Sequence, residues 1–456
     1  MKITNVGSAS FIIEMSGVKI LCDPWFQGLG FMNGWSPLYS LQDMSLVKDI
    51  DYIWFSHEHP DHFHPPSLAL LNKQWDSFPT VLFQKTINGR VKGFIEHKYK
   101  ANVIELSAVK TLKLRTDLQI KVVDVGIYDS YLQIYNDDFC FTHLNDCSVS
   151  NETQLSKIAD SAKNKKHILT SQYGLAHAPC GRSNIALLEK YRSQKVEQFL
   201  TQVKVIAPDY AIPSSSAIHF CSYDNIWMNH YRTNPAELIE PIKEMGGLCL
   251  LPLPEYQYDF EHVLDDIIQK NTEKSSFIIK KLLSKTNELV INEKENLVDF
   301  ERLCRAIKIC SDKIKSSNNI IILMILQKLN ILLGLVNFYI NDLNLFVSAD
   351  PLNGTLTKLR ESPEDFVSVS SYVLEQLYTS DYGVDALNAS GRFDMHGDLT
   401  LIDVNNHLNI CTINLAGIQL NLLSLIKPKV FIKLIRVFGQ WYDFSKKSST
   451  INRNKT

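Results

Sequence analysis

Ser56-His57-Glu58-His59-Pro60-Asp61-His62 is the stretch of sequence that decides the fold and the chemistry of this chain. It follows an apolar, aromatic-rich run at residues 50–55, which predicts a short buried strand. In an extended or turning segment the first two histidines project to the same side and can share one metal ion, while the aspartate and the last histidine reach a neighbouring position. The alternative is a solvated histidine-rich loop. With 13 His in 456 residues, however, chance would seldom fill all four positions. The stretch therefore predicts a metal site with room for two ions.

Two flanking segments carry a resemblance to a known family. Together with the histidine motif, Cys22-Asp23-Pro24-Trp25 and the glycine- and tryptophan-containing segment 28–35 resemble the metallo-β-lactamase superfamily. Within it they are similar to the lactamase-type part of CMP-N-acetylneuraminate hydroxylase and its bacterial relatives. The resemblance implies an α/β fold, the αββα sandwich, that binds two divalent transition metals (zinc, or iron and manganese) and a small-molecule substrate.

Length and composition restrict the other possibilities. A chain of 456 residues is too long for one ordinary core, so two domains are expected. The net charge of −2 argues against a general nucleic-acid binder. The longest apolar run, at residues 320–326, is far shorter than an integral membrane segment, and the N-terminus has no signal-peptide pattern. Nine cysteines without paired spacing predict reduced thiols and a cytoplasmic location.

The chain is expected to divide after its first 260 residues. Strands on both sides of the motif, with helices interleaved, predict two sheets packed face to face between helices. Beyond them the composition shifts to charged residues with helical periodicity. The C-terminal part resembles the smaller α+β domain of the same relatives, which is similar to a sterol-carrier fold. The predicted parts are a metal domain at 1–260, a helical linker at 261–300 and an α+β domain at 301–456, with strands at 320–327, 330–340, 343–349 and 354–359. A last helix at 429–445 is expected to pack on that domain or on the partner of a homodimer.

Several residues are candidates for holding the metals. The motif supplies His57, His59, Asp61 and His62. The family resemblance implies that Asp146, which follows a strand, bridges the two ions, and that His219 is the last ligand. Asp23 ends a strand beside the metal loop, a position typical of a residue that holds the loop by hydrogen bonds.

One part of the ligand set departs from the resembled family. The family carries another histidine just after the strand that precedes the Asp146 hairpin, whereas the matching segment 123–129 of this chain has none. Three explanations are open. The first metal has two histidines and a bridge, or His143 or Asp129 substitutes, or the metal content differs from a standard two-zinc site.

Two segments are candidates for the substrate pocket. Residues 25–48 are too irregular for a helix and too aromatic for a disordered loop, so Trp25 and Trp35 are expected in a pocket wall, although a packed loop would look the same. The loop at 171–183 follows a strand end and carries Tyr173, His177 and Arg182, which suit substrate binding.

Three functions fit these residues. The first is a metal-dependent hydrolase in which the metals generate hydroxide and Asp61 orients it. The second is a dinuclear iron oxygenase like the resembled hydroxylase. Because the chain lacks the Cys-x-His…Cys-x-x-His pattern of a Rieske cluster, that enzyme would need an external electron-transfer partner. The third is a binding protein with an incomplete ligand set. A sugar or sugar nucleotide as substrate is implied by the family resemblance alone.

Overall fold

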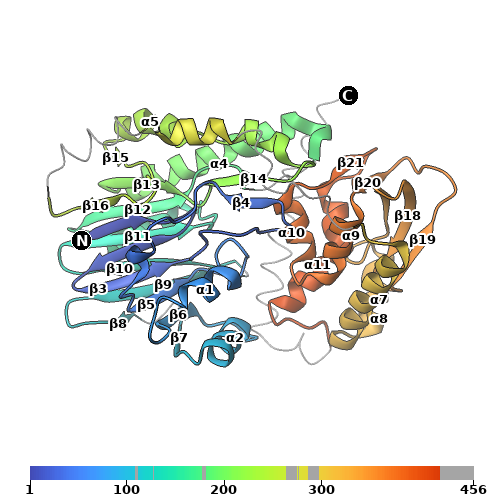
Figure 1. Cartoon of the computed structure of the whole chain (residues 1–456), viewed down its shortest axis with the longest axis horizontal. Helices are drawn as coiled ribbons and strands as arrows, with labels where there is room; N and C mark the ends of the chain where they lie inside the picture. Colours follow the sequence, from blue (N-terminus) through green and yellow to red (C-terminus); the bar gives the residue numbers. More distant parts are fainter. Residues whose placement is uncertain are drawn as a thin grey trace. The chain divides into compact units, whose positions relative to one another are not determined.

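The computed structural model describes residues 1–107, 111–126, 128–176, 181–262, 275, 277–285 and 297–421. The chain forms two compact units, coloured along the sequence in Figure 1. The first unit comprises residues 1–85, 89–177 and 186–291, and the second comprises 86–88, 178–185 and 292–456. Much of the predicted linker at 261–300 falls outside the described residues, so the linker and its exact bounds stay predictions.

Two seven-stranded sheets make up the first unit. Both mix antiparallel and parallel pairs, and each carries side chains on both of its faces. The first sheet has the order β16 (Gln257–Asp259), β1 (Lys2–Asn5), β2 (Phe11–Met15), β3 (Val18–Cys22), β5 (Tyr52–Phe55), β6 (Thr80–Gln84), β7 (Val103–Leu106). The second has the order β15 (Leu248–Cys249), β13 (Tyr210–Ser214), β12 (Lys166–Gln172), β11 (Phe139–Asn145), β10 (Asp129–Tyr135), β9 (Gln119–Val125), β8 (Leu112–Lys113).

The alternation of side chains along the strands builds three apolar layers. On β5, Trp54 faces the layer between the two sheets, while its neighbours Ile53 and Phe55 face the opposite side of the first sheet. The layer between the sheets also contains Ile134 of β10 and Ile168 of β12. The two sheets are therefore packed face to face, and both surfaces of β5 are buried.

Helices cover the outer faces of both sheets. Buried residues of α1 (Pro65–Leu71) and α2 (Arg90–Tyr99) join the outer layer of the first sheet. Those of α3 (Glu152–Ser161), α4 (Ile185–Ile206) and α5 (Ile239–Glu244) join the outer layer of the second. Figure 1 labels α1 and α2 beside the first sheet and α4 and α5 beside the second. The predicted αββα sandwich is confirmed.

Short elements complete the first unit. β4 (Trp35–Pro37) pairs with β14 (Ile218–Phe220), so the aromatic segment after Trp25 is tied to a strand far along the chain. Single helical turns lie at η1 (Met44–Val47), η3 (Ile226–Tyr231) and η4 (Pro235–Leu238).

The second unit is an α+β arrangement, with a five-stranded sheet and helices. Another turn, η2 (Gly181–Asn184), is grouped mainly with this unit. The sheet has the order β19 (Thr355–Lys358), β18 (Leu345–Asp350), β17 (Val336–Ile340), β20 (Phe366–Val369), β21 (Asp394–His396). Its helices are α7 (Phe300–Ser317), α8 (Ile320–Lys328), α9 (Ser371–Thr379), α10 (Gly383–Ser390) and α11 (Leu401–Leu415). The likeness to a sterol-carrier fold stays a prediction, and the predicted helix at 429–445 lies outside the described residues.

One predicted strand of this unit is wrong. Residues 320–327 form most of helix α8, which Asn319 caps by accepting hydrogen bonds from the backbone N–H groups of Ile321 and Ile322. A short apolar run has no polar positions to reveal its period, so its sequence fits a buried strand as well as a helix. Among the described residues, no helix combines the length and apolar character needed to cross a membrane.

Candidate metal centre

The histidine motif begins where β5 ends. Its backbone turns back on itself, because the N–H groups of His62 and Phe63 donate to the carbonyl oxygen of His59 over 3.0 and 2.8 Å. His57 and His62 are completely buried, and Asp61 is nearly so. The motif therefore gathers its side chains inside the protein rather than in a solvated loop.

Asp23 at the end of β3 holds this loop, as its position in the sequence predicts. One carboxylate oxygen accepts from the backbone N–H of Ser56 over 2.8 Å. The other accepts from the Ser56 hydroxyl over 2.7 Å and lies 2.9 Å from Nδ1 of His62. A proton on Nδ1 of His62 satisfies this contact and leaves Nε2 with its lone pair free to bind a metal.

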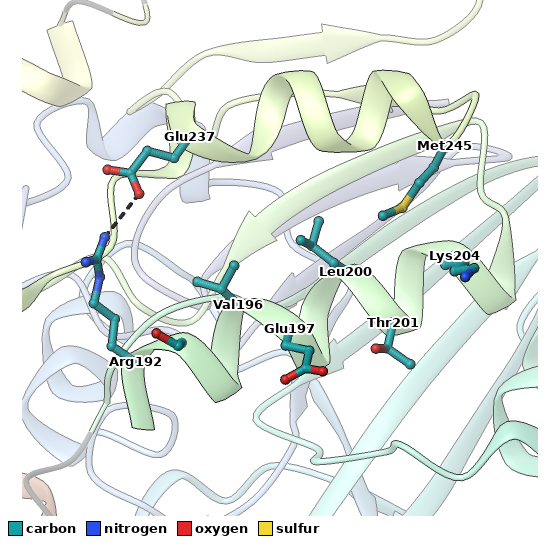
Figure 2. A pocket seen from close by; sticks show the side chains of 9 residues that line it. Arg192, Val196, Glu197, Leu200, Thr201, Lys204, Glu237 and Met245 are labelled. Atoms are coloured by element: carbon teal, nitrogen blue, oxygen red, sulfur yellow. Dashed lines mark hydrogen bonds and ion pairs between the residues drawn. The ribbon is translucent and has the colours of Figure 1, made fainter. Parts of the chain in front are cut away.

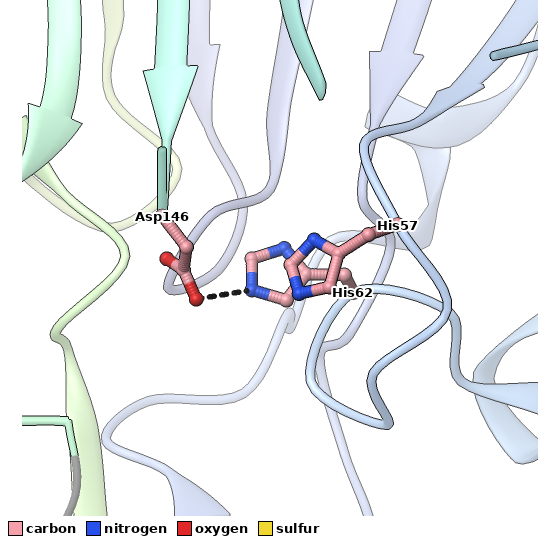
Figure 3. A group of neighbouring side chains, drawn as sticks. All are labelled: His57, His62 and Asp146. Carbon is pink, nitrogen blue, oxygen red and sulfur yellow. Dashed lines mark hydrogen bonds and ion pairs between the residues drawn. The ribbon is translucent and has the colours of Figure 1, made fainter. Parts of the chain in front are cut away.

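His57 and His62, which lie in one loop, meet Asp146 from a distant part of the sequence at the centre (Figure 3). His57, His62 and Asp146 each offer a ligand atom, and these atoms lie within 4.8 Å of one another. Nε2 of His62 is 3.2 Å from Oδ2 of Asp146. Donors bound to one ion at ~2.1 Å are at most ~4.2 Å apart, so this spacing suits either one ion or two adjacent ions that share a ligand.

His59 and Asp61 extend the group on either side. Nδ1 of His59 lies 2.8 Å from Nε2 of His57, and Oδ2 of Asp61 lies 3.2 Å from Nε2 of His62. The second carboxylate oxygen of Asp61 is buried and has no hydrogen-bond partner within the described part of the chain. A buried carboxylate oxygen without a donor is costly unless a cation compensates it, so this donor set fits divalent metals.

Asp146 follows β11, whose last residue Asn145 has a left-handed backbone with a φ of 58°. The amide of Gln172, at the end of the neighbouring β12, donates to Oδ1 of Asp146 over 3.3 Å. Gln172 was not foreseen from the sequence, because the parallel pairing of β11 with β12 is what brings the two strand ends together.

The structure distinguishes between Asp129 and His143, the two candidates to replace the histidine that segment 123–129 lacks. Oδ1 of Asp129, at the start of β10, lies 3.8 Å from Nε2 of His57. His143 instead packs in the core, where one ring nitrogen contacts the carbonyl of Ala9 and the other contacts the hydroxyl of Thr170. Asp129 is therefore at the metal cluster, and both ring nitrogens of His143 are engaged elsewhere.

The electrostatics of the cluster are those of a cation site. Burial lowers the pKa of His57 well below its usual value, and the neighbouring histidines lower it further. Burial also disfavours the charged form of His62, but three surrounding aspartates outweigh it and raise the pKa of His62. Burial raises the pKa of Asp129 to about 6, with Asp146 adding to the shift and His59 opposing it. The three aspartates therefore favour positive charge at the position of the His62 ring.

The predicted substrate residues are placed as follows. Trp25, Trp35 and Tyr173 are buried in the packed interior. Arg182 is exposed in the second unit, where its backbone N–H donates to Asp394, and His177 lies outside the described residues. His219 is completely buried on β14 and is not a member of the three-residue group among the described residues.

An aromatic residue of the predicted pocket-wall segment 25–48 lies beside the cluster. The ring centre of Phe31 is 5.9 Å from that of His59 and 4.5 Å from that of Trp35. Phe31 also has a positive φ of 45°. This contact shows that the aromatic segment 25–48 packs against the histidine motif.

A separate groove of about 520 Å³ lies between α4 and the segment of η4 and α5 (Figure 2). An ion pair of 3.1 Å between Arg192 and Glu237 crosses its rim. None of its lining residues belongs to the metal cluster, so the groove is not part of the candidate centre.

Comparison with known proteins identifies the N-terminal part. Residues 2–161 match the family described as the beta-lactamase superfamily domain. The chain is 43% identical over 70 residues to a protein of Mycolicibacterium smegmatis named as a Rieske 2Fe-2S iron-sulfur protein, and 40% identical over 76 residues to one of Mycobacterium tuberculosis. These matches span 15–16% of this chain and only 13–14% of the length of those relatives.

Some solved structures are similar to part of this chain at low sequence identity. A mutant of CmlA beta-hydroxylase is 15% identical, with a TM-score of 0.41 over 57% of this chain and 54% of that one. The isothiocyanate hydrolase from Delia radicum gut bacteria is also 15% identical, with a TM-score of 0.41 over 57% of this chain and 99% of that one. The similar folds thus include a hydroxylase and a hydrolase, and at this distance neither informs the reaction.

Proposed function

We propose that this chain, whose residues 2–161 match the beta-lactamase superfamily domain, is a metal-dependent hydrolase. The observation that carries the proposal is the convergence of His57 and His62, from the loop after β5, with Asp146, which follows β11. Beside them lies Oδ1 of Asp61, which is buried and has no hydrogen-bond partner among the described residues. The fold binds divalent metals, often two, and the donors found here are those such metals use.

We divide the candidate metal-binding side chains between two metal positions. We assign His57, His59 and Asp129 to the first position and Asp61, His62 and His219 to the second, with Asp146 shared. The short distances of His59 and Asp129 to Nε2 of His57 support the first set. The 3.2 Å contact between Asp61 and His62 supports part of the second, and His219 enters it from the family resemblance.

Two divalent metals bound there would lower the pKa of a water to supply hydroxide at neutral pH and would polarise a carbonyl or phosphoryl oxygen. The protein residues have separate tasks. Asp61 holds and orients the attacking water through a carboxylate oxygen that no described protein group occupies. Asp23 and Gln172 fix the orientations of His62 and Asp146.

The substrate that we propose is a sugar or a sugar nucleotide, on the basis of the family resemblance. Aromatic side chains near the metals suit the apolar face of a sugar ring. Phe31 and Tyr128 both have ring contacts with His59, and Trp35 packs against Phe31. Trp25, Tyr173, His177 and Arg182 stay predictions from the sequence.

A dinuclear iron oxygenase is the second candidate, and one observation favours it. With Asp129 in place of an imidazole, the proposed first shell has three carboxylates, Asp61, Asp129 and Asp146. Oxygen-rich ligand sets suit iron and manganese better than the histidine-rich sets of zinc enzymes. Such an enzyme would take electrons from a separate protein.

Oxygen dependence separates the two candidates. Protein purified without added metal is assayed on a panel of sugar nucleotides and acylated sugars, with and without dioxygen and a reductant, and the bound metal is identified by elemental analysis and EPR spectroscopy. Turnover that is indifferent to oxygen, with zinc bound, is the expected result. Turnover that stops without oxygen, with iron bound, would replace the hydrolase by the oxygenase.

A further inference from the structure

Two cysteines far apart in the sequence meet in the second unit. Cys310 lies on α7 and Cys411 on α11, and their sulfur atoms are 4.0 Å apart. Cys310 is 5% exposed, while Cys411 is half-buried, so the pair lies just beneath the surface. Neither residue belongs to the metal centre, and neither hydrolysis nor oxygenation there uses them.

The surrounding contacts hold the two helices together. At the end of α7, Asn318 accepts a hydrogen bond over 2.8 Å from the backbone N–H of Leu420, which follows α11. The N–H of Asn319 donates to the carbonyl oxygen of Leu420 over 2.9 Å. These bonds lie about two helical turns beyond Cys310, and α7 and α11 are also in direct contact with each other. The thiols therefore meet at a contact between two helices.

The environment makes one thiol the better nucleophile. The hydrogen bond from Cys411 lowers the pKa of Cys310, and Lys313 one turn further along α7 adds to this effect against the cost of burial. The same hydrogen bond and burial raise the pKa of Cys411. Other charged or titratable groups near the pair are Asp381, which pairs with Lys313, and Tyr378, whose hydroxyl bonds to His407.

We propose that Cys310 and Cys411 are a reversible oxidation site at which a hydroperoxide converts the two thiols into a disulfide. An S–S bond of about 2.05 Å requires the sulfur atoms to approach by roughly 2 Å, which side-chain rotation on two adjacent helices can supply. The product links α7 to α11 across 101 residues of chain.

The electrons and atoms of the reaction balance in two steps. The sulfur of Cys310 attacks one oxygen of hydrogen peroxide, the O–O bond breaks, and Cys310 sulfenic acid and one water form. The sulfur of Cys411 then attacks the sulfur of Cys310, and the hydroxyl of the sulfenic acid leaves with the thiol proton as a second water. Two electrons pass from the sulfur pair to the peroxide, and a dithiol such as dithiothreitol returns them.

Peptide mapping of the full-length protein tests the proposal without a variant. The protein is treated with hydrogen peroxide, alkylated, digested with trypsin without reduction and analysed by mass spectrometry. The expected product is a cross-linked pair of peptides, one with Cys310 and one with Cys411, that disappears after dithiothreitol. If both thiols are still alkylated after peroxide treatment, or if they are oxidised without being joined, the proposal is wrong.

Variants test the order of the steps. In Cys411→Ser, the sulfenic acid of Cys310 should persist and react with dimedone. The matched control Cys304→Ser changes a half-buried cysteine on the same helix and should leave the cross-link intact. Oxidation should also raise the unfolding temperature of the unsubstituted protein by about 5 °C or more, but not that of Cys310→Ser. Loss of the cross-link in Cys304→Ser, or an equal shift in Cys310→Ser, would contradict the assignment.

Discussion

Replacing Asp23 by Asn tests how the protein prepares His62 for metal binding. Both oxygens of Asp23 accept hydrogen bonds in a site that is completely buried. Asn keeps the shape and one acceptor but presents an N–H₂ group where the second oxygen was. If that group faces Nδ1 of His62, the ring must move its proton to Nε2, the nitrogen that faces Asp146.

The expected cost follows from this change of tautomer. Loss of a partner that orients a metal-binding histidine weakens metal affinity by about 10- to 100-fold, which corresponds to ~1.4 to 2.7 kcal/mol. One hydrogen bond to a charged group is also lost, so the free energy of unfolding should fall by ~1.5 to 3 kcal/mol. Competition with a chromophoric chelator measures the affinity of the second metal, and urea unfolding of the metal-free protein measures the stability.

The matched control is Asp51→Asn. Asp51 also accepts a backbone hydrogen bond, from Lys19 over 2.8 Å, but it is exposed and outside the cluster. This control should change neither the affinity for the second metal nor the free energy of unfolding appreciably. If Asp23→Asn binds both metals as tightly as the unsubstituted protein, the role assigned to Asp23 is refuted, whatever happens to stability.

Three further predictions concern the metal cluster, the core and the second unit. Asp129→Asn should lower the affinity for the first metal at least ~10-fold. Asp124→Asn, a change at an exposed residue of β9, should leave that affinity unchanged. Elemental analysis after dialysis measures this, and equal metal retention by both variants would exclude Asp129 as a ligand. Trp54→Ala, which empties the layer between the two sheets, should lower the free energy of unfolding by ~3 to 5 kcal/mol in urea titrations, and a cost under ~1 kcal/mol would contradict the packing described. Burial lowers the pKa of His407 to about 4, so the unfolded chain takes up its proton near pH 6.5 while the folded protein does not. The free energy of unfolding should therefore fall by roughly 3 kcal/mol as the pH drops from 6.5 to 4. If the free energy of unfolding of His407→Gln depends on pH in the same way, this prediction is refuted.

The metal motif could be predicted because its information is local. Residues 57–62 lie within one turn after a strand, so their spacing alone brings the side chains together. The apolar, aromatic-rich run before these residues likewise predicts the buried strand β5. The position of Asp23 at a strand end was enough to predict its hydrogen bonds to the loop.

The remaining features depend on contacts that a single sequence does not encode. Gln172 reaches Asp146 because β11 and β12 are parallel neighbours, and only strand order places Asp129 rather than His143 beside His57. The run that forms α8 is apolar at nearly every position, so no periodicity separated helix from strand.

Metal content is the most direct test of the central claim. The full-length protein is purified without added metal or chelator, and zinc, iron and manganese are quantified by elemental analysis beside the double variant His57→Ala/His59→Ala. The account predicts at least one equivalent of transition metal per chain, with the first position emptied in a variant that still folds. Less than about a tenth of an equivalent in the unsubstituted protein, even after incubation with these metals, would contradict it.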